Sequence, residues 1–340
     1  MPSIFSRLIL LLVIVSSVTA CSPPEEKEAP AEKVTVQLKW LHQAQFAGFY
    51  VAREKGFFQE ENLKVTFLEG GPQIDIAKTL VAGQADFAVM APEDLLIKRS
   101  QGIPLTAVAA IYRRSAVVFL SLPGSNIKRP FDFIGKTVAV AGKEGSVRDF
   151  EFQFHALARN LDLDVERMDI VPYDPEFKSF LSKDVDVTAT YMTGGLVRLR
   201  QKGYQPKVIW PGDYGVHFYS DILVTREEII QNHPDKVKRF VRASLKGWRK
   251  AIGDPEAALA AVMPYARIKD EAVQMGMMEA MLPLVHTGED RIGWMRRRQW
   301  REMIRIMHDQ EILPKSFQNT DEVFTMRFLE SVYGEEVDRP

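Results

Sequence analysis

Aromatic, amide, hydroxyl and carboxylate side chains recur in this sequence directly after stretches with the pattern of β-strands. The candidates from the first half are Trp40, Gln45, Phe46, Glu93 and Tyr112, and those from the second half are Tyr191, Thr193, Asp213 and Tyr214. The carboxyl ends of parallel strands and the amino ends of helices meet at one edge of a sheet, so we expect these side chains to share a crevice. Aromatic faces with a few polar groups suit a flat, polar heterocycle.

Each candidate also has a purely structural interpretation. Trp40 could be a core aromatic, and Glu93 could simply favour the positive end of the helix that it opens. An anion such as nitrate or a sulfonate would recruit arginine and backbone amides instead. Arg113 and the turn at 142–146 keep that ligand class open.

Motifs for catalysis are absent from the sequence. The six histidines include no pair at helical zinc spacing, and no nucleophile elbow, phosphate loop or dinucleotide turn occurs. We therefore predict no metal, no cofactor and no enzymatic activity.

The composition excludes further classes. Lys and Arg number 44 against 45 Asp and Glu, which argues against nucleic acid as a partner. The single cysteine allows neither an intramolecular disulfide nor a thiolate cluster. A length of 340 residues with 46% hydrophobic residues predicts two lobes or one large domain.

The one cysteine, Cys21, follows a basic start, a short apolar run and a series of small residues. This order is typical of an export signal, and the apolar run is too short to span a membrane. Val-Thr-Ala-Cys resembles a bacterial lipoprotein box, which predicts a signal peptide at 1–20 and a lipid on Cys21; the alternative is an ordinary signal peptide. Residues 21–33 are rich in proline and charge and predict a tether. The expected location is the periplasm or cell surface, anchored to the membrane.

The rest of the chain alternates strand and helix, which predicts an α/β fold with mainly parallel sheets. The first unit has expected strands at 34–40, 65–68 and 86–90 and helices at 44–58, with an end near Gly56, at 75–82 and around 95–97. The second has strands at 136–141, 168–171 and 185–190 and helices at 145–160 and 176–182. Asp86 and Asp186 open corresponding strands, and we expect their side chains to bond the preceding backbone amides.

From residue 226 onward the sequence predicts helices, which pack on one lobe or extend between the two. The expected helix at 294–308 is basic, and its arginines predict a solvated face or a surface that docks a partner.

Three segments carry a family resemblance: LKWLHQAQFAGFYVAREKGFF at 38–58, GQADFAV at 83–89 and DYGVHFYSD at 213–221. They resemble the solute-binding lipoproteins of ABC importers related to the thiamine-pyrimidine-precursor binding proteins. The resemblance implies a type II periplasmic-binding-protein fold, with lobe 1 at 34–119 plus 223–340, lobe 2 at 120–222, and crossover strands near 117–122 and 220–225. It also implies a permease in the inner membrane as partner, and we expect a monomer.

By position in the family pattern, Trp40 would supply a stacking face, Gln45 and Glu93 would contact the edge of the ligand, and Tyr191, Asp213 and Tyr214 would form the opposing wall. Relatives often carry Asn-Glu where this chain has Gly194-Gly195. A lost acceptor and a wider site make riboflavin or another flavin-like ligand a rival to a thiamine pyrimidine.

Two other function classes stay open. Some members of this superfamily make the thiamine pyrimidine, but that chemistry is associated with a cysteine-rich motif and a cytoplasmic location, and neither fits this chain. A ligand sensor that presents its closed form to a membrane kinase is the other alternative.

Overall fold

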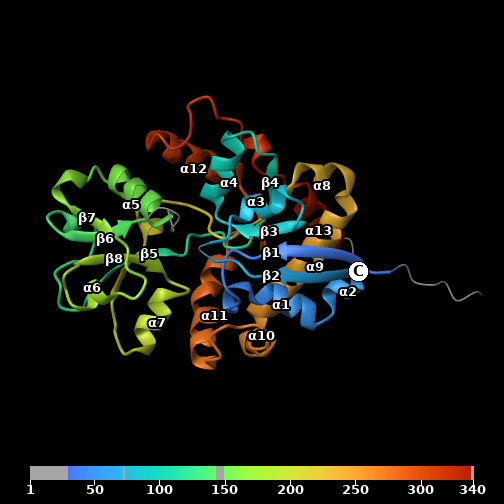
Figure 1. Cartoon of the computed structure of the whole chain (residues 1–340), viewed down its shortest axis with the longest axis horizontal. Helices are drawn as coiled ribbons and strands as arrows, with labels where there is room; N and C mark the ends of the chain where they lie inside the picture. Colours follow the sequence, from blue (N-terminus) through green and yellow to red (C-terminus); the bar gives the residue numbers. More distant parts are fainter. Residues whose placement is uncertain (1–29, 72, 143–148, 338–340) are drawn as a thin grey trace, which may run out of the picture. The chain divides into compact units, whose positions relative to one another are not determined.

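Two sheets of five strands organise the chain in the computed structural model, which describes residues 30–71, 73–142 and 149–337 (Figure 1). The first sheet contains β1 (Glu32–Gln37), β2 (Leu63–Leu68), β3 (Phe87–Met90), β4 (Leu105–Ala110) and β10 (Ile222–Arg226). The second contains β5 (Val117–Ser121), β6 (Thr137–Ala141), β7 (Asp169–Pro172), β8 (Val187–Tyr191) and β9 (Lys207–Ile209). The prediction of an α/β fold is confirmed.

The two sheets have equivalent strand orders, β2-β1-β3-β10-β4 and β7-β6-β8-β5-β9. In each, the first three strands are parallel and the fourth is antiparallel to both of its neighbours. The chain passes between the sheets twice, from β4 to β5 and from β9 to β10. In open α/β sheets, ligands bind at the loops that follow the carboxyl ends of the parallel strands, and both halves of this molecule have such loops.

Helices flank each sheet. Those of the first half are α1 (Ala47–Glu54), α2 (Phe57–Glu60), α3 (Ile76–Val81) and α4 (Pro92–Ser100), and those of the second are α5 (Asp149–Asn160), α6 (Lys178–Leu181) and α7 (Gly195–Gln201). The C-terminal helices are α8 (Glu227–Asn232), α9 (Pro234–Gly253), α10 (Pro255–Val262), α11 (Glu271–Val285), α12 (Arg297–Asp309) and α13 (Arg327–Val337). Short 3₁₀ turns lie at Ala44–Phe46, Pro130–Phe133, Val165–Arg167, Pro211–Tyr214 and Thr320–Glu322.

Several expected elements differ in extent. The helix predicted at 44–58 ends near Gly56 as expected, because Gly56 takes a left-handed φ of 75° after α1. Its first three residues form a 3₁₀ turn, and Phe57 and Phe58 belong to the separate helix α2. The helix predicted at 176–182 shrinks to the four residues of α6, since Phe177 before it is also left-handed, with a φ of 58°. The strand predicted at 168–171 is displaced by one residue. Of the helix predicted at 145–160, residues 145–148 lie outside the described residues, and the rest forms α5 from Asp149 onward.

Asp86 and Asp186 play the same part in the two halves, but the expected partners were wrong. Asp86 Oδ2 accepts from the backbone amide of Thr35 at 2.8 Å, and Asp186 Oδ2 accepts from that of Thr137 at 3.1 Å. Thr35 and Thr137 lie on the neighbouring strands β1 and β6, so each carboxylate ties two strands of its sheet together rather than closing its own turn. This repeated contact supports an internal duplication.

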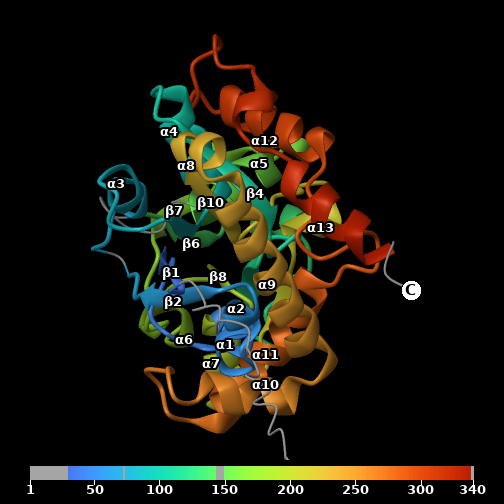
Figure 2. The same cartoon turned by 90° about the vertical axis from the view of Figure 1, so that its right-hand side faces the viewer.

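Close packing of α1 against α9 fixes the helical layer beneath the loop after β1 (Figure 2). Glycine is required on both helices: a Cβ on Gly48 would lie 2.1 Å from the ring of Trp248, and one on Gly247 would lie 2.2 Å from the backbone oxygen of Gly48. The fully buried Trp248 fills the space between them. This contact holds the segment from 39 to 46 in place, because that segment leads directly into α1.

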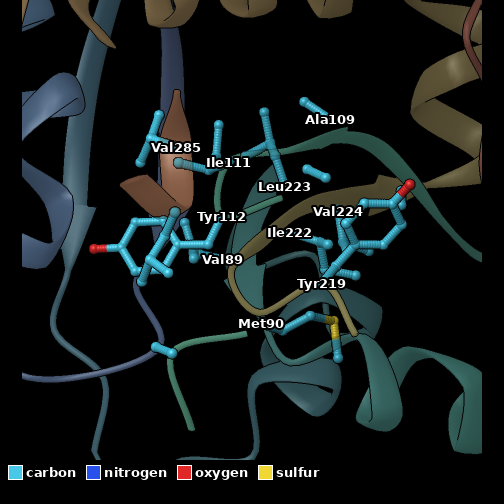
Figure 3. Packing of buried hydrophobic residues seen from close by; sticks show 14 of the residues in the cluster. Val89, Met90, Ala109, Ile111, Tyr112, Tyr219, Ile222, Leu223, Val224 and Val285 are labelled. Atoms are coloured by element: carbon cyan, nitrogen blue, oxygen red, sulfur yellow. The ribbon is translucent and has the colours of Figure 1, made fainter. Parts of the chain in front are cut away.

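The buried centre of the first half gathers side chains from β3, β4 and β10, with Val285 of α11 (Figure 3). Tyr112 and Tyr219 lie at its edges with their hydroxyl groups pointing in opposite directions (Figure 3). The Tyr112 hydroxyl donates to the backbone oxygen of Gln45 at 3.2 Å, and that of Tyr219 accepts from the amide of Arg296 at 2.7 Å. Each tyrosine thus satisfies its polar end at a loop while its ring fills the core.

The C-terminal helices contact both halves. α9 packs on α1, whereas α11 contacts α7, and the Gln310 side chain donates to the Phe152 backbone oxygen of α5 at 3.0 Å. The segment therefore extends between the two halves, which was one of the two expected arrangements. In the described part of the chain, no helix is long and apolar enough to cross a membrane.

Three exposed arginines around α12 are engaged in ion pairs. Arg296 pairs with Asp290, Arg297 with Asp321, and Arg305 with both Glu302 and Asp309. Such pairs at the surface describe a solvated face. Docking of a partner on this helix stays a prediction.

Candidate functional site

A buried ammonium group lies where elements of the two halves meet. Lys39 follows β1, and its Nζ lies 3.5 Å from Oδ1 of Asp221 and 3.7 Å from Oδ2 of Asp149. Asp221 precedes β10 of the first sheet, while Asp149 begins α5, which packs on β6 of the second. We call Lys39, Glu93, Asp149, Tyr191 and Asp221 the Lys39 cluster.

The charges of this cluster are interdependent. Burial acts to lower the pKa of Lys39, but the carboxylates of Asp149 and Asp221 outweigh it and hold that pKa above its usual value. Burial raises the pKa of Asp221, and Lys39 and Gln45 oppose the change. The ammonium therefore stays charged because it has two carboxylate partners, at 3.5 and 3.7 Å.

Gln45 supports the cluster from the first half. Its Nε2 donates to Oδ2 of Asp221 at 2.6 Å, and its own Oε1 accepts from Nε2 of Gln43 at 2.7 Å. The Tyr112 hydroxyl holds its backbone oxygen. Gln45 is thus held through both polar atoms of its side chain and through its backbone oxygen, and it orients the carboxylate of Asp221 toward Lys39.

Tyr191 supports the cluster from the second half, at the carboxyl end of β8. Its hydroxyl donates to Oδ2 of Asp149, and its ring centroid lies 5.3 Å from Nζ of Lys39. The ring also lies against Phe150, with centroids 4.9 Å apart. Tyr191 thus contributes both a hydrogen bond to the anion and an aromatic face to the cation.

Glu93 is the carboxyl group of the cluster that lacks a complete set of partners. It is the second residue of α4 and is 2% exposed, and its Oε1 has no hydrogen-bond partner within the described residues. Burial raises the pKa of Glu93 to about 8, and the charge of Asp149 adds to the effect. The positive end of a helix favours a carboxylate by only ~0.3–1 kcal/mol, so burial prevails here.

Trp40 adjoins Lys39 and is half-buried at the same end of β1. Its backbone oxygen accepts from the amide of Gly70 at 3.0 Å, where the chains approach so closely that a Cβ on Gly70 would lie 2.2 Å from the Leu38 backbone oxygen. This contact fixes the turn that presents both Lys39 and Trp40.

The structure brings together only part of the predicted set. Gln45, Glu93 and Tyr191 belong to or support the Lys39 cluster, and Trp40 adjoins it. Phe46 and Tyr112 are core residues, and Thr193 is buried.

Asp213 lies elsewhere. It is exposed and lines a separate hollow of about 680 Å³ with Arg113 and Trp210, close to the half-buried Tyr214. Arg113, which had kept an anionic ligand open, is already engaged by Asp290 and Thr287. Cys21 and residues 143–146 lie outside the described residues.

Sequence reasoning missed Lys39, Asp149 and Asp221. Lys39 and Asp221 fall inside the segments that carry the family resemblance. From sequence alone, however, a lysine at the end of a strand is expected to face solvent. Only the tertiary structure shows that these three charged groups from distant positions lie together.

The two glycines after β8 have different roles. A Cβ on Gly195 would lie 2.0 Å from Oγ1 of Thr190 and 2.6 Å from the ring of Phe177, so internal packing requires this glycine. A Cβ on Gly194 would meet nothing closer than 4.0 Å. Only Gly194 can therefore leave room for a larger ligand.

Metal chemistry finds no support in the described residues. No group of three or more His, Cys, Asp and Glu side chains among them could hold a metal ion. The carboxylates of the Lys39 cluster face an ammonium group instead.

Comparison with known proteins gives a family match and several relatives. The family model described as NMT1/THI5 like matches residues 43–258. The riboflavin-binding protein RibY of Chloroflexus aurantiacus is 26% identical, with 81% of this chain and 83% of the relative covered. A formylaminopyrimidine-binding protein of Halalkalibacterium halodurans is also 26% identical, with 74% and 77% covered. At 23% identity, with 67% and 69% covered, the chain is similar to a 4-amino-5-hydroxymethyl-2-methylpyrimidine phosphate synthase of Saccharomyces cerevisiae.

Among solved structures, the periplasmic aliphatic sulphonate binding protein of Escherichia coli matches with a TM-score of 0.70. The identity is 13%, and 86% of this chain and 92% of that chain are covered. A likeness at this identity shows the fold alone. The predicted periplasmic-binding-protein fold is confirmed.

Proposed function

This chain belongs to the NMT1/THI5-like family, and we propose that it is an extracytoplasmic solute-binding protein that delivers a flat nitrogen heterocycle to an ABC importer. The observation that carries the proposal is the Lys39 cluster. It draws side chains from both halves of the molecule to the carboxyl ends of the strands, which is where open α/β sheets bind ligands.

The relatives named for riboflavin and for formylaminopyrimidine support a heterocycle as ligand. Trp40 and Tyr191 offer aromatic faces beside polar groups that can read the edge of a ring. Gln45 and Glu93 are the proposed edge contacts. A thiamine pyrimidine precursor and a flavin remain the two candidate ligands.

Capture would proceed by closure of two lobes, with lobe 1 at 34–119 plus 223–340 and lobe 2 at 120–222. The contact of Lys39 with Asp149 joins the end of β1 to α5, so an opening movement must break it. A ligand that contacts both halves stabilises the closed form and shifts the population toward it.

The proposed location is outside the cytoplasm, on a lipid attached to Cys21, with a membrane permease as partner and a monomeric binding protein. Cys21→Ser would then leave the protein unlipidated and free of the membrane fraction, whereas Ser22→Ala would change neither. A membrane fraction that keeps the Cys21→Ser protein would contradict the lipid anchor.

A second candidate function is synthesis of the pyrimidine itself, favoured by the yeast relative. The one cysteine of this chain weighs against it, as the cysteine-rich motif associated with that chemistry is missing. Pyrimidine formation by the purified protein with iron would decide for the enzyme.

Native mass spectrometry of the protein purified from its own host tests the binding function. We expect a co-purified mass in the range of a pyrimidine or a flavin, and calorimetric binding of the same compound to the refolded protein. A protein that carries no heterocycle and binds neither riboflavin nor 4-amino-5-hydroxymethyl-2-methylpyrimidine would refute the proposal.

A further inference from the structure

The Lys39 cluster holds an excess of carboxyl groups. Glu93, Asp149 and Asp221 all act electrostatically on the ammonium of Lys39, and so does the neighbouring Asp94. Lys39 is the cation that balances them, with its Nζ between Asp149 and Asp221. Gln45 donates to Asp221 and Tyr191 donates to Asp149, so Glu93 is the carboxyl group of the Lys39 cluster for which a donor is missing.

The unpartnered oxygen of Glu93 is the second observation. A buried carboxyl oxygen without a hydrogen bond is unfavourable, and native proteins rarely keep one without a reason. Glu93 is 2% exposed, and the charges of Asp149, Lys39 and Asp94 all affect its pKa. It therefore belongs to the buried Lys39 cluster rather than to the surface. A donor supplied by a ligand would complete it.

We infer, resting on the proposed binding function, that the ligand carries a cationic nitrogen group, such as a protonated amine or amidine on a flat ring, which binds between Glu93 and Asp149. Charge-assisted hydrogen bonds from such a group to two carboxylates are stronger than neutral ones. In this arrangement Lys39 acts as an internal counter-ion, and Asp149 binds both Lys39 and the ligand.

The same arrangement disfavours anions. A sulfonate or phosphate group would lie beside the three buried carboxyl groups of the Lys39 cluster. Lys39 would have to break both of its ion pairs to bind the anion. This chain thus shares the fold of a sulphonate-binding protein, but the charges of the Lys39 cluster predict a cationic ligand rather than an anion.

Two probes of nearly the same shape test the inference. 4-Amino-5-aminomethyl-2-methylpyrimidine carries an ammonium group at neutral pH where 4-amino-5-hydroxymethyl-2-methylpyrimidine carries a hydroxyl. Titration calorimetry at pH 7.0 should give at least tenfold tighter binding of the aminomethyl compound. Binding should also release a proton from Glu93, which appears as a dependence of the measured heat on the ionisation enthalpy of the buffer.

Variants locate the effect. Glu93→Gln should reduce the preference to less than threefold and abolish proton release, and Asp149→Asn should reduce the preference in the same way. Glu330→Gln, which changes an exposed glutamate of α13, should alter neither. Thermal unfolding of each variant confirms that it is folded, and having two variants at different positions keeps the test decisive if one does not fold.

The outcomes separate the inference from the proposed function. Equal or tighter binding of the hydroxymethyl compound or riboflavin would overturn the inference and leave the binding function intact. A native ligand that is a neutral heterocycle would do the same. Absence of binding to every heterocycle would overturn both.

Discussion

Replacing Glu93 with glutamine should make the protein more stable in alkaline solution than the native sequence. The carboxyl group is buried, with a pKa raised from 4.5 to about 8. Between these values the folded protein keeps a proton that the unfolded chain releases. The contribution of Glu93 to stability is thus fully present below about pH 4.5 and is lost as the pH rises through about 8.

The magnitude follows from the two pKa values. The difference between about 8 and 4.5 corresponds, at ~1.4 kcal/mol for each pH unit, to ~5 kcal/mol as an upper value. Glutamine has nearly the same shape and does not ionise. The free energy of unfolding of the variant relative to the native protein should therefore rise by ~4–5 kcal/mol between pH 4.5 and pH 9.

Urea unfolding followed by circular dichroism at several pH values measures this difference directly. Effects of titrating groups outside the Lys39 cluster and Asp94 cancel in the comparison, because both proteins share them. At pH 9 the midpoint temperature of the variant should be higher by ~5–10 °C. A difference in stability that stays constant within ~1 kcal/mol from pH 4.5 to pH 9 would refute the assignment of Glu93 as a buried neutral acid.

Three further predictions concern the surroundings of Glu93. Lys39→Met leaves two buried carboxylates without their cation and should lower the free energy of unfolding by ~3 kcal/mol at pH 7. This value is at the low end for a broken buried ion pair, because Gln45 and Tyr191 still donate to the carboxylates. A loss below ~1 kcal/mol in urea titration would contradict the ion pair. Gly195→Ala should destabilise by ~1–3 kcal/mol through contact with Thr190 and Phe177, while Gly194→Ala should be tolerated; equal melting temperatures for the two would speak against this packing. Trp40→Ala should abolish heterocycle binding with a nearly unchanged melting temperature, whereas Trp294→Ala should keep binding; retained affinity after Trp40→Ala, or a loss of ~3–5 kcal/mol, would assign Trp40 to the core instead.

Much of the fold was accessible from local patterns. Alternation of apolar residues placed the strands β1, β2, β3, β6 and β8 within two or three residues, since one side of each must face a core. The helix expected at 75–82 starts correctly, because the side chain of Asp75 accepts from the backbone amide of Lys78 and caps α3. The helix end near Gly56 was predicted, whereas the left-handed conformation of Phe177, which shortens the helix at 176–182, was not.

The candidate site was accessible only in part. Gln45, Glu93 and Tyr191 could be selected because they follow strands, and strand ends meet at one edge. Phe46 satisfies the same rule but points into the core, and Asp213 satisfies it but lies at a different hollow. Position along a strand gives the edge of the sheet, and it does not give the direction of a side chain.

The sequence by itself determined the α/β class, the two similar units, the absence of catalytic motifs and the family resemblance, because these depend on residue types and short spacings. The tertiary structure alone decided that Lys39, Asp149 and Asp221 form one ionic cluster and that Glu93 lies buried beside it. The charge of a buried group depends on its neighbours and on its exclusion from water, and both are set by contacts between residues more than a hundred positions apart in the chain.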